Sequence, residues 1–226
     1  MMLDFLKTYV RAVSLDDARF DRFFASGVKR SDFLLFEESV VCEFKEIENF
    51  NVGNRVEHLV KKNKGAQTNL KRDLYNTISN ALSTANQQIR ETKNSLGSDE
   101  ALGLVILENL IPIDLSVLCL IDAADRKMAQ GLDSTDGVLC LDFVNTFIGT
   151  DGSYIRFAQI VVRNVERSEK LYALVGEMLD DFGGSHNTPI HEDFHISKAD
   201  QIWKTNKTGQ YQDYSATLNI LGEPKE

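Results

Sequence analysis

Apolar side chains recur at helical spacing through the first part of the chain and then give way to two strand-like runs. Phe20, Phe23 and Phe24 form the expected buried side of the second helix, which Gly27 ends. The runs that follow are rich in aromatic and β-branched residues and are separated by Glu37-Glu38-Ser39, which is typical of two strands joined by a turn. The elements predicted here are helices at 2–13 and 15–25, strands at 33–36 and 40–47, and a polar loop or weak helix at 48–67.

Helices and strands alternate in the rest of the chain. The predicted elements are a helix at 69–95, a strand at 102–108, a helix at 114–128, strands at 137–144 and 155–162, and a helix at 171–182 that ends at Gly183-Gly184. Strands that are apolar on both faces must be covered by other elements on both faces of the sheet. The sequence therefore predicts an α/β fold, with a mixed β-sheet flanked by helices on both faces. We expect one domain over residues 1–184 and a polar C-terminal extension over residues 185–226.

The cysteines and the apolar runs indicate the compartment. The three cysteines, Cys42, Cys119 and Cys140, each lie in an apolar run of the 226-residue chain. An odd number in such places predicts reduced core thiols and a cytoplasmic protein, not a disulfide framework. No window approaches the roughly eighteen consecutive apolar residues of a transmembrane helix, so no membrane association is expected. The first residues lack a basic start and a small-residue cleavage site, which argues against a signal peptide.

Charge is distributed unevenly. The net charge of −9 argues against a protein that coats nucleic acid generically, because such proteins are usually basic. The segment from Lys61 to Lys93, however, contains seven basic and two acidic residues, a net charge of +5. Lys71 and Arg72 are candidate phosphate contacts there, and a solvated charged face is the alternative.

Three charged residues of the predicted hairpin carry the candidate chemistry. Side chains alternate along a strand, so Glu43 and Lys45 project from the same face. If the turn is Glu37-Glu38, Asp32 lies directly opposite Glu43. A longer turn makes the pairing diagonal. A slip of one residue would move the side chains to the opposite face of the sheet. Two adjacent carboxylates repel each other, and a divalent cation such as Mg²⁺, which prefers oxygen ligands, removes that repulsion.

Asp32, ten intervening residues and then Glu43-Phe44-Lys45 resemble the Asp and (Asp/Glu)-x-Lys signature of the PD-(D/E)XK superfamily of restriction-endonuclease-like proteins. The resemblance covers roughly residues 15–110. The superfamily's core order, αβββαβ, is approximately met, but the third strand is not identified, and Ser31 replaces the proline that often precedes the Asp. The resemblance implies a restriction-endonuclease-like fold and a nuclease in which Asp32 and Glu43 hold Mg²⁺ or Mn²⁺. Lys45 would then position the attacking water or the scissile phosphate.

Superfamily members often place a polar or basic residue from the next helix beside the metal. Gln88 is the candidate for that role, with Thr92 and Lys93 behind it, and a solvent-facing polar stripe is the alternative. Asp17 or Asp21 is the candidate for a further acid on the preceding helix.

The resemblance implies phosphodiester hydrolysis of a nucleic acid, with DNA as the expected substrate and a homodimer as an open possibility. The alternative is a catalytically inactive, nuclease-like scaffold that binds nucleic acid or protein, which the acidic net charge and the long tail favour. The pattern E-x-K also occurs by chance, in which case Glu43 and Lys45 form a solvated salt bridge.

A second motif lies near the C-terminal end. His191-Glu192-Asp193-Phe194-His195 has the letters of the H-E-x-x-H zinc-protease motif, whose chemistry requires a helix. Pro189 permits only a helix start here, so a loop or strand with incidental histidines is the better interpretation and a zinc hydrolase is the third hypothesis. No Gly-rich phosphate loop, G-x-S-x-G or C-x-x-C motif is present, so kinase, dinucleotide-binding, serine-hydrolase and redox functions have no support.

Overall fold

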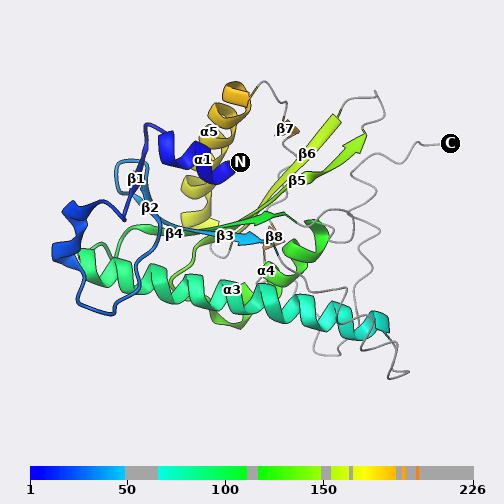
Figure 1. Ribbon diagram of the computed structural model, residues 1–226, viewed down its shortest axis with the longest axis horizontal. Helices are drawn as coiled ribbons and strands as arrows, with labels where there is room; N and C mark the ends of the chain where they lie inside the picture. Colours follow the sequence, from blue (N-terminus) through cyan, green and yellow to red (C-terminus); the bar gives the residue numbers. More distant parts are fainter. Residues whose placement is uncertain are drawn as a thin grey trace.

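A mixed β-sheet with helices on both faces forms the molecule, as predicted (Figure 1). The computed structural model describes residues 1–48, 66–110, 117–148, 154–162, 165–186, 190–191 and 197–198. The described helices are α1 (Met2–Thr8), the 3-10 helix η1 (Ala18–Phe23), α3 (Ala66–Leu96), α4 (Val117–Gly131) and α5 (Val165–His186). The described strands are β1 (Ala12–Ser14), β2 (Phe33–Leu35), β3 (Val40–Ile47), β4 (Leu102–Asn109), β5 (Gly137–Ile148), β6 (Tyr154–Val162), β7 (Ile190–His191) and β8 (Ser197–Lys198).

The strands are ordered β1-β2-β3-β4-β5-β6-β7, and β8 also pairs with β6. β1, β2 and β3 are antiparallel neighbours. β4 is parallel to β3, and β5 is parallel to β4. β6 returns antiparallel to β5, and β7 and β8 run parallel to β6. Parallel pairs need long crossover connections, and these contain α3 between β3 and β4 and α4 between β4 and β5.

Each face of the sheet has its own apolar core. One core lies under α1 and α5 and contains Phe44, Ile106 and Phe182. The other lies under η1, α3 and α4 (Figure 1). Among the described side chains of α3, those buried in this second core follow the helical repeat: Ile78, Leu82, Ala85 and Ile89. Every residue of β4 is buried, because helices cover both of its faces.

The N-terminal elements differ from the prediction. The helix expected at 2–13 ends at Thr8, because Tyr9 adopts an extended conformation with φ −68° and ψ 126°. The chain then forms β1, which pairs with β2. The second expected helix is only the 3-10 helix η1, and Phe23 is 41% exposed instead of buried.

Other element boundaries also differ from the prediction. The last long helix was expected to end at Gly183-Gly184, but α5 continues through both glycines to His186. The expected strand 33–36 ends at Leu35. The expected loop or weak helix at 48–67 lies mostly outside the described residues, and α3 begins at Ala66.

Gly103 of β4 lies where no other residue fits. A Cβ atom at this position would stand 2.0 Å from the carbonyl oxygen of Ser134. The close approach allows the Gly103 N–H to donate to Asp136 Oδ2 at 2.7 Å, and its carbonyl accepts the Asp136 N–H at 2.8 Å. The loop before β5 is thereby fixed against the start of β4.

Candidate metal and active site

The β2–β3 hairpin places two carboxylates side by side. Phe33 pairs with Cys42, so the next positions outward in the same register are Asp32 and Glu43. This is the register predicted from a Glu37-Glu38 turn. The backbone N–H of Phe44 donates to Asp32 Oδ2 at 2.8 Å, which holds the Asp32 side chain against β3.

Glu43 is buried and only partly satisfied. Its side chain is 1% exposed and lies on the sheet face that α3 covers. Oε1 accepts a hydrogen bond from the Lys45 ammonium, whereas Oε2 has no hydrogen-bond partner among the described residues. Burial, followed by the charge of Asp32, raises the pKa of Glu43 to about 7, and the nearby Lys45 limits the rise. Burial also raises the pKa of Asp32. The pair therefore holds negative charge at a cost in free energy that a bound cation would reduce.

Lys45 connects the carboxylates to α3. Its ammonium contacts Glu43 and also donates to Gln88 Oε1 at 3.1 Å. The Gln88 amide in turn donates from Nε2 to the carbonyl oxygen of Arg30 at 3.0 Å. Gln88 thus fixes both the lysine and the chain just before Asp32. The structure brings together all four candidate residues, and their catalytic and metal-binding roles remain predictions.

Thr92 and Lys93 lie on different sides of α3. Thr92 is buried, and its hydroxyl accepts the backbone N–H of Ser31 at 2.8 Å. It therefore supports the chain beside Asp32. Lys93 was expected behind Gln88, but it points away from the carboxylates and donates to the carbonyl of Ser134 at 3.1 Å. Five positions along a helix correspond to a rotation well away from the face of Gln88.

A further acid near Asp32 is Asp16, and neither Asp17 nor Asp21, the two candidates from the sequence, takes that position. Asp17 caps η1 by accepting the Arg19 N–H, and Asp21 pairs with Arg30 at 2.8 Å. Asp16 lies close enough to Asp32 to contribute to raising its pKa, after burial. Asp16 could not be identified from the sequence, because its position depends on the pairing of β1 with β2. Arg30, by contrast, could be recognised as a neighbour of the site from the sequence, because it stands two residues before Asp32.

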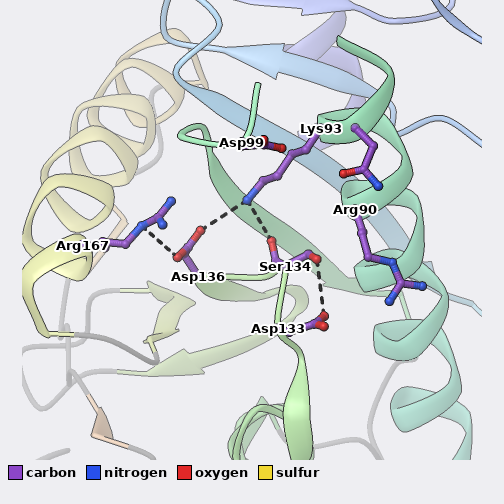
Figure 2. A pocket seen from close by; sticks show the side chains of 8 residues that line it. Arg90, Lys93, Asp99, Asp133, Ser134, Asp136 and Arg167 are labelled. Carbon is purple, nitrogen blue, oxygen red and sulfur yellow. Dashed lines mark hydrogen bonds and ion pairs between the residues drawn. The ribbon is translucent and has the colours of Figure 1, made fainter. Parts of the chain in front are cut away.

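A second polar site lies at the other side of α3 (Figure 2). This cavity of about 190 Å³ is lined by Arg90, Lys93, Asn94, Asp99, Asp133, Ser134, Asp136 and Arg167. Asp136 contacts Lys93 at 3.7 Å and Arg167 at 3.2 Å, so one carboxylate joins α3 to α5 through the start of β5. Burial lowers the pKa of Lys93, and Asp136 opposes that effect. Asp136 balances the charges of Lys93 and Arg167, so this cluster is a structural junction between α3 and α5.

Some of the expected site residues lie beyond what the structure describes. The side chains of Lys71 and Arg72 are outside the described part, and so is His195. His191 is in β7, a strand, so it does not have the helical setting that an H-E-x-x-H zinc site requires. Cys42 and Cys140 are free and buried.

The described residues contain no group of three or more His, Cys, Asp or Glu side chains that could hold a metal ion. A carboxylate pair remains compatible with Mg²⁺, which is commonly bound by one or two carboxylates together with water and substrate phosphate. None of the described helices combines the length and the apolar character needed to cross a bilayer. No protein-family model, curated protein or solved structure matches the chain.

Proposed function

We propose that the protein is a restriction-endonuclease-like nuclease that hydrolyses phosphodiester bonds of nucleic acid with Mg²⁺ or Mn²⁺. The observation that carries the proposal is the convergence of Asp32, Glu43 and Lys45 on one side of the β2–β3 hairpin. The element order from α1 to β4 is α, β, β, β, α, β, apart from the short η1, and this agrees with the superfamily core. The sequence left the third strand unidentified because residues 48–68 are polar, and β1, which precedes the hairpin, supplies a third strand before α3.

Asp32 and Glu43 offer the chemistry that a hard divalent cation needs. Both supply oxygen atoms, and Glu43 Oε2 is buried without a hydrogen-bond partner among the described residues. Asp32 uses Oδ2 to accept the Phe44 N–H, so Oδ1 remains as its oxygen for a ligand. A bound Mg²⁺ would supply Lewis acidity at the phosphoryl group and lower the pKa of a bound water.

Lys45 is the residue that would contact the reacting groups. Its side chain is 26% exposed, so the ammonium can reach a phosphate or a water from solvent while Glu43 and Gln88 fix its position. A compact ammonium suits a point contact to an anionic oxygen. Gln88 acts through Lys45 and is therefore a positioning residue.

Cleavage of plasmid and linear DNA and of RNA, with Mg²⁺ or Mn²⁺, tests the proposal. Glu43→Ala and Lys45→Ala are expected to lower the rate at least 100-fold, because electrostatic and metal-held groups contribute on that scale. Glu108→Gln is the matched control, since Glu108 is 1% exposed, has an Oε2 atom without a partner among the described residues and lies on neighbouring β4. Glu108 belongs to the face of α1, so its replacement should leave cleavage unchanged. Cleavage that survives both site substitutions would exclude the proposed mechanism.

A non-catalytic scaffold is the second candidate. It is favoured by the Glu43–Lys45 ion pair, which partly compensates the buried carboxylate without a metal. Titration calorimetry separates the two candidates: a scaffold binds nucleic acid and takes up no Mg²⁺, whereas the nuclease takes up Mg²⁺ and loses this uptake in Glu43→Ala.

A further inference from the structure

The segment between β1 and β2 leaves the candidate site and returns to it. At its start, the Leu15 N–H donates to the carbonyl of Asp32 at 2.9 Å. At its end, the Arg30 carbonyl accepts the Gln88 amide, and the Ser31 N–H donates to Thr92. Both ends of this segment are therefore fixed beside the carboxylate pair.

Three arginines of this segment lie over phenylalanine rings. The pairs are Arg19 over Phe20 at 4.8 Å, Arg22 over Phe23 at 4.7 Å and Arg30 over Phe24 at 5.7 Å. The rings have different roles: Phe20 is buried and Phe24 packs against the core under α3, so these two anchor the segment. Phe23 is 41% exposed and contributes little to the core.

The exposed Phe23 ring lies under the exposed guanidinium of Arg22, 4.7 Å away. Arg19 pairs with Asp17, and Arg30 pairs with Asp16 and Asp21. Arg22 and Lys29, by contrast, are exposed, and their side chains have no ion-pair partner among the described residues. The segment therefore combines a 41% exposed aromatic ring, with Arg22 over one side of it, and two exposed cations that have no ion-pair partner among the described residues.

We propose that the segment Ala18–Arg30 is a stacking platform for single-stranded nucleic acid, with a base on Phe23 and phosphates on Arg22 and Lys29. The inference rests on the proposed function for the class of ligand. An aromatic ring with neighbouring arginines binds bases without sequence preference, because every base has a π-face. In a duplex that face is already stacked, so the platform selects single strands and frayed or unpaired ends.

The size and charge of the surface agree with this ligand. Two available cations neutralise few phosphates, and the net charge of −9 opposes contact with a long duplex. A stable protein partner would instead require about 800 Å² of complementary surface. Among the described residues, the other exposed large apolar side chains are Met1, Val10 and Val144, which lie outside this segment.

Fluorescence anisotropy of the full chain tests the proposal, with a 20-nucleotide single strand and the blunt duplex of the same sequence, in Ca²⁺ to prevent cleavage. Phe23→Ala is expected to weaken single-strand binding about ten-fold, the effect of one lost base stack, and to change duplex binding less than two-fold. A uridine oligonucleotide of equal length is used as the single-stranded RNA ligand in the same assay. Arg126→Gln is the matched control, because Arg126 of α4 lies over the ring of Tyr75 of α3 at 5.7 Å, outside the segment. The Arg126→Gln variant should bind nucleic acid as tightly as the unaltered chain does.

Arg22→Gln provides an independent readout. It is expected to lower the slope of log affinity against log salt by about one, as for one lost phosphate contact. This substitution also decides the question if Phe23→Ala does not fold. An unchanged slope, unchanged single-strand binding in Phe23→Ala, equal losses for both ligands, or no nucleic acid binding at all would overturn the platform.

Cleavage assays run in parallel keep the two proposals separate. Metal-dependent cleavage together with unaltered single-strand binding in Phe23→Ala overturns the platform and retains the nuclease. Single-strand binding that depends on Phe23, without any cleavage by the unaltered chain, supports the platform and overturns the nuclease.

Discussion

Asp32 and Glu43 lie beside each other across the β2–β3 hairpin, with Glu43 Oε2 buried and without a hydrogen-bond partner among the described residues. Such a pair is unfavourable for the stability of the metal-free protein. Burial and like charge raise the pKa of Glu43 to about 7 from its ordinary value of 4.5. The same two groups thus connect stability, pH and cation binding.

The first prediction concerns stability in the absence of metal. Because the folded protein holds the Glu43 proton more tightly than the unfolded chain does, the stabilising effect is complete below pH 4.5 and is lost as pH rises to about 7. The loss corresponds to about 3 kcal/mol. Glu43→Gln removes this titration and should raise the free energy of unfolding by about 1–3 kcal/mol at pH 8, with little effect at pH 4.5. Denaturant unfolding at both pH values measures it, and equal effects at both would contradict the assigned titration.

The second prediction concerns the pH dependence of cation binding. A metal ligand must be deprotonated, and the pKa of Glu43 is about 7. The affinity for Mg²⁺ should therefore fall roughly ten-fold for each pH unit below 7 and level off above it. Calorimetric titrations between pH 5.5 and pH 8.5 would show this, and a constant affinity across that range would remove Glu43 from the site.

The third prediction concerns Asp136, which contacts Lys93 and Arg167. Lys93 is 8% exposed, so Asp136→Ala leaves a buried ammonium without this carboxylate and should destabilise the fold by about 3–5 kcal/mol. Adding Lys93→Met should recover part of that loss, because it removes the buried charge. Glu177→Ala is the control: it breaks the exposed ion pair with Arg11 and should leave the free energy of unfolding almost unchanged. A loss in Asp136→Ala no larger than in this control would show that the junction is not structural.

The fourth prediction concerns the hairpin turn. Phe36, Glu37 and Glu38 all have positive φ, with 66° at Glu38, a conformation that costs non-glycine residues about 1–2 kcal/mol each. Glu38→Gly should therefore stabilise the protein by about 1 kcal/mol in thermal or denaturant unfolding. Glu37→Gly should gain less, because it also loses two hydrogen bonds from Arg11, each at 3.2 Å. A destabilised Glu38→Gly variant would contradict the assigned backbone conformation.

The hairpin could be predicted because its signals are local. Alternating apolar positions and a short acidic turn determine the register, and Asp32 and Glu43 follow from it. β1 was missed because Leu3, Leu6, Val10 and Val13 also fit one continuous helix. Val10 is 90% exposed, and the strand forms only because β2 offers it hydrogen bonds. The apolar pattern within a segment does not indicate a partner strand that is distant in the sequence.

The same limit applies to the surroundings of the site. Gln88 was identifiable from its place on the helix after the hairpin, whereas Asp16 approaches Asp32 only through the pairing of β1 with β2. The expected orientation of Lys93 was wrong because the helix face toward the hairpin is set by the burial of Ile89 and Thr92. The α/β class, by contrast, followed from strands that are apolar on both faces.

Crystals soaked in Mn²⁺ provide the most direct test of a shared cation site. The account predicts an anomalous difference peak about 2.1 Å from Glu43 Oε2 and an Asp32 oxygen, absent in crystals of Glu43→Gln. A fully soaked crystal with no peak between these two carboxylates, or with the same peak in Glu43→Gln, would contradict it.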